Sequence, residues 1–525
     1  MLRRLGLRFP TLIAKKSCKG RPLKSIQNFF GLQIVASLLL LIFAGSIVAA
    51  QCGAQTASVR RPATTAVAAA PGVPALMVSD IHFDPFHDPD KLQKLIDAPV
   101  DQWSAILAAP PSPNQKQAFD ALQQQCKLRG VDTSYDLLQS SLQAMRARQA
   151  DAKFMTVSGD LMAHSFSCRF KELRPQSTES DYQAFALKTV SFVVSSLQLA
   201  FPHIPIYVAM GNNDSGCGDY KLDAGSDFLA KAGKIFGDAL PLPQRQDLVQ
   251  QFAAGGYYNI AMAAPMKDAR LIVVNDVYLS PKYTTCGGMP NLTAANAEMD
   301  WLRQQLVSAQ QAGQKVWIMG HIPPGINAPS TVLKMKNICA DAKPVTFLSS
   351  GIMADLMLEH ASTIRLGIFG HTHMDELRLL QPEAGDTSPT AEHSVVLKLV
   401  PSITPIDGNN PSFTAARINP STAKLEDYAV IAASNQNGVG ATWSQEYDYA
   451  RTYHEADFSP ATVKDLIAKF HADPGSQQEI SNDYIRNYFV GDRSVALKPF
   501  WPQYACSLGN TTAKSYASCV CATGK

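Results

Sequence analysis

The sequence predicts an α/β fold with mixed sheets, and three patterns support this. Apolar runs such as 75–78 and 315–319 stop abruptly at Ser or Gly followed by a polar residue, as buried strands do. Amphipathic stretches between such runs, 134–150 and 297–313, have the residue spacing of helices. Strand-like segments within 394–434 have no helix between them, so a purely parallel sheet is not expected.

The first 50 residues predict a signal peptide or a signal anchor. They contain eight basic and no acidic side chains, and an apolar stretch fills residues 29–50 and ends in small residues. The same stretch is about long enough to span a bilayer, so an uncleaved anchor that tethers the protein through residues 29–50 is the alternative. In either case we expect the body of the protein to be secreted, periplasmic or otherwise extracytoplasmic.

The rest of the chain divides by composition into a linker and two folded regions. Residues 51–72 are rich in Ala, Thr and Pro and predict a flexible linker. Residues 73–434 hold the alternating strands and helices and form the expected catalytic domain. Residues 435–525 are mainly of helical character, with Ser459 as a good N-cap, and form the expected C-terminal helical domain.

Eight cysteines follow the linker and predict disulfide bonds formed in an oxidising compartment. Their number is even and no spacing matches a zinc finger, but the sequence leaves their pairing open. Three of them lie in the last twenty residues, where we expect them to staple the helical tail. The eight are Cys126, Cys168, Cys217, Cys286, Cys339, Cys506, Cys519 and Cys521.

The distribution of charge argues against a body that attracts polyanions. The whole chain has a formal net charge of +3, but without residues 1–50 it holds 39 basic and 44 acidic side chains, a net charge of −5. We therefore expect no nucleic-acid binding. A hydrophobic content of 46% and a charged content of 17% are ordinary for a globular protein.

Five of the predicted strands end in residues that can bind metal ions. Taken singly, each is weak evidence, because a His in an apolar run is more often a core residue and an Asp after Gly is more often a turn residue. Ligands of α/β proteins gather at the carboxyl ends of strands, so the number and order of these side chains favour a site for two divalent metals. The candidate ligands are Asp80, His82, Asp160, Asn212, His321, His371 and His373.

The motifs around these residues resemble those of the calcineurin-like metallophosphoesterase superfamily, and within it the acid sphingomyelinase-like phosphodiesterases. The resemblance covers most of residues 76–525. It implies a four-layer α/β/β/α sandwich with mixed sheets, plus a small C-terminal helical domain stapled by disulfides. The motifs are DIH at 80–82, GDLMAH at 159–164, GNND at 211–214, GHIPPG at 320–325 and GHTH at 370–373.

The resemblance also implies which residue binds which metal ion. Asp80, His82 and His373 would hold one ion, and Asn212, His321 and His371 the other. Asp160 would bridge the two ions, and a hydroxide between them would attack phosphorus in line. The family suggests two Zn²⁺ ions, and Mn²⁺ or iron would also fit these ligands.

The sequence departs from the family at the proton donor. Many members have a His after the ligand asparagine, whereas this chain has Asn213, which can hydrogen-bond a phosphate oxygen but cannot usefully donate a proton. His164, four residues after Asp160, is the candidate general acid, because sphingomyelinase-like members carry a His there. Its alternative is a surface-loop histidine without a catalytic role.

These observations predict an exported hydrolase of phosphodiesters. The expected substrate is a sphingomyelin-type membrane lipid, cleaved to a ceramide-type product and phosphocholine. The alternative within enzymes is a nucleotide phosphate or polyphosphate, because GNND also resembles the endopolyphosphatase branch, although the net charge of −5 weakly disfavours polyphosphate. The alternative from another class is an inactive extracellular binding protein on the same scaffold.

Overall fold

The computed structural model describes residues 72–266, 268–383, 391–490 and 496–523. All of them belong to one compact unit, Ala68–Lys525. The expected export signal at 1–50, its tether at 29–50 and the linker at 51–72, apart from Gly72, lie outside the described residues. No helix in the described part of the chain is long and apolar enough to cross a membrane.

The first of two six-stranded sheets has the strand order β12-β11-β10-β1-β2-β3. β1, β2 and β3 are parallel, whereas β10, β11 and β12 are antiparallel to their neighbours. The strands are β1 Val73–Val78, β2 Met155–Val157, β3 Ile206–Val208, β10 Ser412–Ile418, β11 Leu425–Ala433 and β12 Trp443–Asp448.

The second sheet has the strand order β4-β5-β6-β7-β9-β8. Its four central strands are parallel and the two edge strands β4 and β8 are antiparallel to them, so both sheets are mixed, as the sequence predicts. The strands are β4 Tyr258–Ala261, β5 Ala269–Val273, β6 Lys315–Met319, β7 Ile364–Phe369, β8 Glu376–Leu380 and β9 Val395–Leu399.

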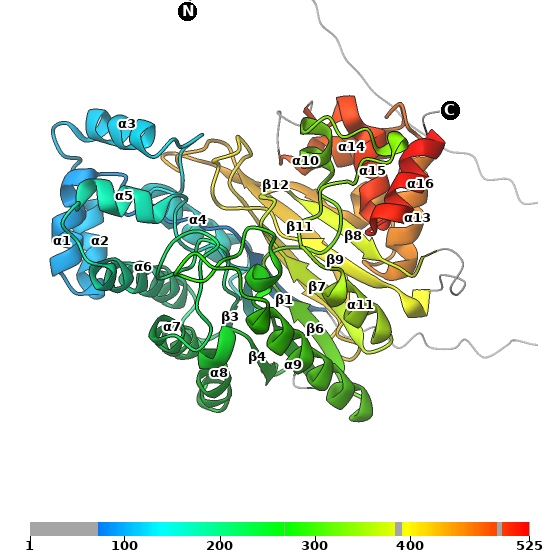
Figure 1. Ribbon diagram of the computed structural model, residues 1–525, viewed down its shortest axis with the longest axis horizontal. Helices are drawn as coiled ribbons and strands as arrows, with labels where there is room; N and C mark the ends of the chain where they lie inside the picture. Colours follow the sequence, from blue (N-terminus) through cyan, green and yellow to red (C-terminus); the bar gives the residue numbers. More distant parts are fainter. Residues whose placement is uncertain (1–71, 267, 384–390, 491–495, 524–525) are drawn as a thin grey trace, which may run out of the picture. The chain divides into compact units, whose positions relative to one another are not determined.

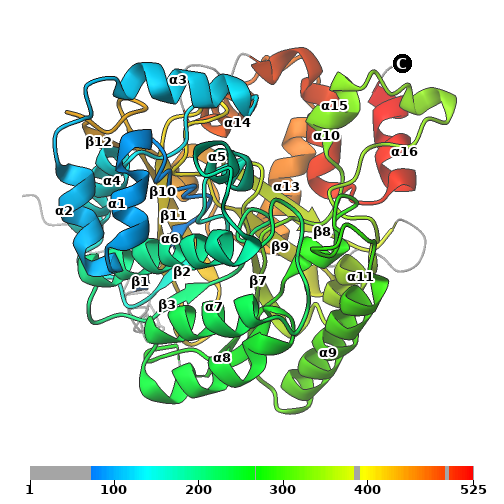
Figure 2. The same cartoon turned by 60° about the vertical axis from the view of Figure 1, so that its left-hand side comes forward.

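The two sheets pack face to face, with helices on their outer sides (Figures 1 and 2). Trp317 of β6 shows the contact between the sheets: its ring lies 5.8 Å from that of Phe154 beside β2, and its Nε1 donates a hydrogen bond to the carbonyl of Ala423, between β10 and β11. A single hydrophobic cluster runs through both sheets and most of the helices. The predicted four-layer sandwich is therefore confirmed.

The helices before β4 include α4, which packs on β10, and α7, which packs on β3. Ser134 caps α4 and Ser226 caps α7 through their side chains. The eight helices are α1 Leu92–Asp97, α2 Trp103–Ala108, α3 Gln115–Gln125, α4 Tyr135–Arg148, α5 Phe166–Leu173, α6 Glu179–Ala200, α7 Asp227–Asp238 and α8 Leu242–Gly255.

The helices after β5 include α9, which packs on β5 and β6, and α13 and α15, which pack on β8. The predicted N-cap Ser459 is confirmed, because its side chain accepts a hydrogen bond from the backbone N–H of Thr462. The helices are α9 Leu292–Gln311, α10 Ala328–Leu333, α11 Ile352–Glu359, α12 Tyr449–Tyr453, α13 Pro460–His471, α14 Glu479–Tyr488, α15 Trp501–Gly509 and α16 Ala513–Thr523.

All eight cysteines that follow the linker form disulfide bonds, which confirms the prediction. Two bonds staple the C-terminal helices: Cys506–Cys519 joins α15 to α16, and Cys339–Cys521 joins α16 to the loop after α10. Cys126–Cys168 and Cys217–Cys286 lie in the earlier part of the chain. The expected domain boundary between residues 434 and 435 stays a prediction.

Candidate metal centre

The seven candidate ligands lie in loops directly after β1, β2, β3, β6 and β7. These loops follow the carboxyl ends of parallel strands in both sheets. Five of the ligands have a left-handed backbone that non-glycine residues rarely adopt, each at a cost of about 1–3 kcal/mol. Such strain persists only where the surrounding structure enforces it, and it is typical of functional sites. The five and their φ angles are Asp80 (47°), His82 (43°), Asp160 (54°), His371 (70°) and His373 (64°).

Close packing of the backbone brings two of these loops together. A Cβ atom at Gly211 would overlap the carboxylate of Asp160, so only glycine fits there. Asp214 joins the same two loops, because its carboxylate accepts hydrogen bonds from the backbone N–H groups of Gly211, Leu161 and Met162 at 2.8–3.1 Å. Asp214 therefore organises the backbone around the site.

The two aspartates at the centre are buried and hydrogen-bonded in ways that favour their ionised forms. The carboxylate of Asp80 accepts hydrogen bonds from the hydroxyl of Ser79 and the backbone N–H of His371. Burial raises the pKa of Asp80, but hydrogen bonds with His373 and His82 outweigh this and hold it well below the usual value. Burial likewise raises the pKa of Asp160, and the charges of His321 and His82 lower it below its usual value.

Two buried histidines point a free nitrogen into the site. The Nδ1 atoms of His82 and His321 each lie 2.8 Å from a backbone carbonyl, those of Met162 and Ser158 respectively. A carbonyl only accepts, so Nδ1 carries a proton, and in the neutral ring Nε2 is the atom whose lone pair can bind a cation. The Nε2 atom of His82 is buried without any hydrogen-bond partner.

A first group of ligand atoms surrounds Oδ1 of Asp80. Nε2 of His82 lies 3.7 Å from this oxygen, and Nε2 of His373 lies 3.4 Å from it. Nδ1 of His373 lies 2.9 Å from a carboxylate oxygen of Asp407, which orients the ring.

A second group surrounds Nε2 of His321. Oδ1 of Asn212 lies 3.2 Å from this nitrogen and Nδ1 of His371 lies 3.3 Å from it. The amide nitrogen of Asn212 donates a hydrogen bond to Asp219, so its oxygen is the atom that faces the site.

Asp160 lies between the two groups. Its Oδ2 atom is 3.4 Å from Nε2 of His82 and 3.2 Å from Nε2 of His321. One carboxylate oxygen is thus shared by side chains from both sheets.

The donor atoms fit divalent cations. Lone pairs of carboxylate, amide and imidazole groups face one another here, and an unpaired buried nitrogen costs free energy unless a partner is supplied. The site also attracts positive charge: burial lowers the pKa of His321, but Asp160 and Asp80 outweigh burial and raise it to about 10. A His/Asp metal-binding site is therefore present, with Asp80, Asp160 and His321 at its centre.

Two further groups of potential ligands occur in the described residues. His82, His164 and His373 form one of them, at the edge of the same site. The other has another explanation. His471, Cys506 and Cys519 lie close together, but the two cysteines are joined in a disulfide and offer no thiolate.

His164, the predicted general acid, lies at the edge of the site. Its ring stacks on that of His82 with centroids 3.9 Å apart, and 28% of its side chain stays exposed. Nδ1 of His164 lies 2.8 Å from Asp132, whose carboxylate is also held by Arg169 and Thr404. Burial lowers the pKa of His164, but the Asp132 carboxylate outweighs burial, so the pKa is raised.

Asn213 supports the central carboxylate. Its backbone N–H donates to Oδ1 of Asp160 at 2.8 Å, and its side-chain amide donates to Oδ2 at 2.9 Å. The expected hydrogen bond from Asn213 to a phosphate oxygen stays a prediction.

Four aspartates that orient candidate site residues were missed by the sequence analysis, and one of them is Asp219, the partner of Asn212 described above. Asp132 lies in a loop without a motif, so nothing in the sequence marks its contact with His164. Asp407 lies in the PSITPIDGNN segment, where its polar surroundings suggest only a turn. Asp276 follows the apolar run of β5 as the candidate ligands follow theirs, which was a usable signal; it accepts hydrogen bonds from the backbone N–H groups of His321 and Ile322.

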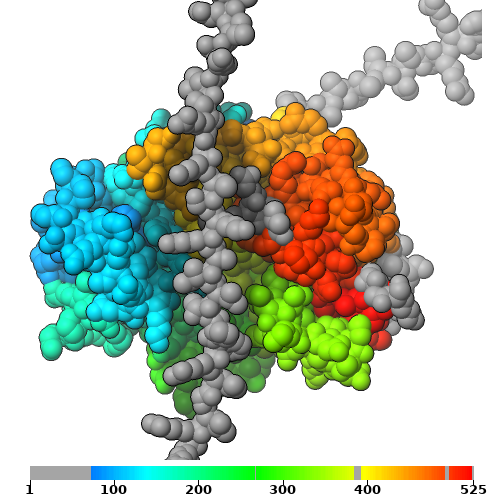
Figure 3. Space-filling model, turned by 90° about the horizontal axis from the view of Figure 1, so that it is seen from above, coloured from blue at the N-terminus to red at the C-terminus, as the bar shows by residue number. Residues whose placement is uncertain are grey.

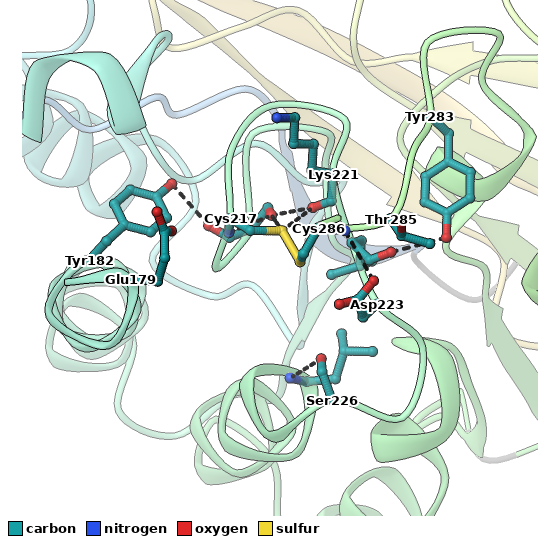
Figure 4. Close-up of a disulfide and its surroundings, with 12 residues drawn as sticks. Glu179, Tyr182, Cys217, Lys221, Asp223, Ser226, Tyr283, Thr285 and Cys286 are labelled. Atoms are coloured by element: carbon teal, nitrogen blue, oxygen red, sulfur yellow. Dashed lines mark hydrogen bonds between the residues drawn. A yellow bond between two sulfur atoms is a disulfide. The ribbon is translucent and has the colours of Figure 1, made fainter. Parts of the chain in front are cut away.

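A disulfide braces the loop that follows Asn212. Figure 4 shows Cys217–Cys286 joining this loop to the one after β5, where the backbone N–H of Cys286 also donates to Asp223. The braced loop carries Tyr220, whose hydroxyl lies 3.5 Å from Nε2 of His371. The bond therefore steadies one border of the site.

Comparison with known proteins agrees with this geometry. The family model described as calcineurin-like phosphoesterase matches residues 73–375, more than half of the chain. A Dictyostelium discoideum protein named sphingomyelinase phosphodiesterase C is 25% identical over 378 residues, which cover 70% of this chain and 76% of the relative. Human acid sphingomyelinase-like phosphodiesterase 3b is 24% identical over 408 residues (75% and 81%). Human cyclic GMP-AMP phosphodiesterase SMPDL3A is 25% identical over 402 residues (74% and 80%). This chain therefore belongs to the calcineurin-like phosphoesterase family and is a metal-dependent phosphodiesterase.

Proposed function

We propose that this protein hydrolyses a sphingomyelin-type phospholipid to a ceramide-type product and phosphocholine. The single observation that carries the proposal is the position of Asp160 Oδ2, within 3.4 Å of histidine Nε2 atoms from both ligand groups. This arrangement suits two cations that act together on one phosphate group. The names of two relatives, a sphingomyelinase and an acid sphingomyelinase-like phosphodiesterase, support the substrate class.

In this proposal Asp80, His82 and His373 hold one cation, and Asn212, His321 and His371 hold the other. Asp160 contributes to both. When bound, two divalent cations lower the pKa of water and neutralise charge on the phosphate oxygens. We propose zinc, because histidine nitrogens and carboxylate oxygens are ligands that Zn²⁺ prefers.

The remaining residues act on the proton and on the orientation of the ligands. His164, held by Asp132, gives its proton to the ceramide oxygen as the bond from phosphorus to that oxygen breaks. The oxygen of water forms the new bond to phosphorus, and the proton that this water loses replaces the one that His164 gave, so the products are ceramide and phosphocholine. Asn213 keeps the Asp160 carboxylate in place through two hydrogen bonds.

We also propose that the protein acts outside the cytoplasm. Its four disulfides support this, because such bonds persist in oxidising compartments.

A nucleotide phosphodiester is the second candidate substrate. The observation that favours it is the relative named as a cyclic GMP-AMP phosphodiesterase, which is as similar to this chain as the sphingomyelinase-named relatives are. The net charge of −5 beyond residue 50 offers no general attraction for such an anion, so recognition would depend on the site alone.

A panel of substrates tests the proposal. The purified chain, loaded with zinc, is assayed on sphingomyelin in mixed micelles, bis-p-nitrophenyl phosphate, cyclic GMP-AMP, nucleoside triphosphates and polyphosphate, each with and without chelator. We expect chelator-sensitive release of phosphocholine, at a higher kcat/KM than for the nucleotides. Hydrolysis of cyclic GMP-AMP with sphingomyelin untouched would replace the first substrate by the second. If metal binds and no substrate turns over, the inactive binding protein is favoured.

A further inference from the structure

The last residue of α10 and the turn that follows the helix expose two large apolar side chains. Leu333 is 81% exposed and Met335 is 90% exposed, more than any other large apolar side chain in the described residues. Single exposed apolar residues are ordinary on soluble proteins. Here two of them lie two positions apart at the same turn, where Met335 itself has a left-handed backbone (φ 49°).

The same turn is basic. Lys334 and Lys336 are exposed and alternate with the apolar side chains, and Lys343 follows; residues 328–343 contain three lysines and a single acid, Asp341. This local excess of positive charge contrasts with the net charge of −5 beyond residue 50. Apolar side chains interleaved with lysines are typical of surfaces that bind anionic membranes.

The residues directly after the turn are held in place by packing and by a disulfide. Ile338 packs with Ile326, Cys506 and Tyr516 in a small hydrophobic cluster of its own, and the disulfide Cys339–Cys521 lies beside it. Figure 3 shows the yellow-green segment that contains α10 beside the red C-terminal helices at the surface. The exposure of Leu333 and Met335 is therefore a property of an ordered loop.

The turn belongs to a segment, residues 325–347, that is joined at its base to the border of the candidate metal centre. It starts shortly after His321, and it returns at Phe347, whose ring centroid lies 6.2 Å from that of His371. The backbone N–H of Phe347 donates to the carbonyl of Gly325, which closes the segment at its base. The base of the segment that carries the turn thus contacts a candidate ligand.

We propose that residues 333–336 dock the protein onto lipid bilayers that contain anionic lipids. Leu333 and Met335 enter the boundary between headgroups and acyl chains, while Lys334 and Lys336 lie among the anionic headgroups. Docking itself is independent of the substrate. Its benefit to catalysis rests on the proposed function, because a phospholipid substrate must be taken from such a surface.

A local fluorescent probe tests docking directly. Leu333→Trp is mixed, as the full zinc-loaded chain, with vesicles of phosphatidylcholine and phosphatidylserine, and the wild-type signal is subtracted. We expect the emission to shift to shorter wavelength and to be quenched by lipids brominated near the headgroup. The matched control is Leu242→Trp, at a residue that is 69% exposed on α8, and α8 lies far from α10 in both ribbon views. Its emission should not change.

Turnover tests the link to catalysis. Leu333→Ser/Met335→Ser should lower kcat/KM for sphingomyelin in vesicles by about tenfold or more, since two apolar side chains no longer insert. Hydrolysis of soluble bis-p-nitrophenyl phosphate should stay unchanged, and Leu242→Ser should affect neither substrate. Lys334→Gln and Lys336→Gln should each weaken docking about fivefold, on anionic vesicles alone.

Four results would overturn the inference or separate it from the proposed function. If the Leu333→Trp emission does not change when vesicles are added, the loop does not dock on membranes. If the emission shifts with protein concentration in the absence of lipid, a second copy of the chain is the better occupant. Equal loss on vesicle and soluble substrates would reject the benefit of the loop to catalysis, because a docking surface affects the vesicle substrate alone. Vesicle binding through the loop without sphingomyelin hydrolysis would keep the docking surface and reject the lipid substrate.

Discussion

Replacing His164 by alanine should slow the enzyme in proportion to how much the leaving group needs a proton. Nδ1 of the ring lies 2.8 Å from Asp132, and the ring stacks on His82 and lies close to the ligand atoms of His82 and His373. General acid catalysis contributes about 10²–10⁴-fold, so His164→Ala should lower kcat for sphingomyelin by about this factor. Bis-p-nitrophenyl phosphate, whose p-nitrophenolate leaves without protonation, should lose less than about tenfold.

The pH profile gives a second readout of the same residue. Because the pKa of His164 lies above its usual value, the protonated form should persist above pH 6.5 and be lost only as the pH rises through the raised pKa. The corresponding alkaline decline in sphingomyelin turnover should therefore vanish in His164→Ala.

Metal content and folding are the controls for this variant. Asp132 keeps Arg169 and Thr404 as partners, so the fold should survive, and bound zinc should be unchanged when measured by elemental analysis. Equal losses of kcat on both substrates, with metal content intact, would show that His164 does not act as the acid.

Three further predictions concern the centre, a buried acid and the C-terminal staple. Asp160→Ala should reduce bound zinc below two ions per chain by elemental analysis and abolish turnover, since its carboxylate serves both ligand groups; two retained ions would contradict the shared role. Burial raises the pKa of Glu298 to about 8 from 4.5, so its neutral form stabilises the fold at low pH and this contribution is lost as the pH rises from about 4.5 to 8. Glu298→Gln should therefore lose less stability than the wild type between pH 5 and pH 8, by on the order of 2 kcal/mol in urea unfolding; parallel curves would refute this. Cys339→Ser/Cys521→Ser should lower the free energy of unfolding by about 2–4 kcal/mol, with activity on bis-p-nitrophenyl phosphate retained; an unchanged Tm would show that the bond adds no stability.

The sequence sufficed for the fold class and for the residues that gather at the strand ends. Each candidate ligand directly follows an apolar run, and parallel strands bring such ends to one edge of a sheet, so Asp80 could be expected near Asp160, and His321 near His371. The contact between Asp80 and His371, 291 positions apart, joins the two sheets, and only the family resemblance implied it. The helix cap at Ser459 was an equally local signal.

What the sequence could not supply depends on contacts between distant loops. Asp132 and Asp407 orient His164 and His373, but each lies in a loop whose local composition indicates only a turn. The pairing of Cys339 with Cys521 could not be chosen among the many possible connectivities of eight cysteines. The left-handed backbone of His82 and its neighbours is likewise enforced by tertiary packing and has no sequence signature in non-glycine residues.

The bond between Cys339 and Cys521 also sets an order of events during biosynthesis. The second cysteine is made 182 residues after the first, when every strand of both sheets has already left the ribosome. A nascent chain could therefore assemble the two sheets while the support beneath Leu333 and Met335 was still open. The apolar turn would reach its final position only late, after the Cys339–Cys521 bond has formed. Leu333 and Met335 would therefore be held at the surface only after both sheets have been synthesised.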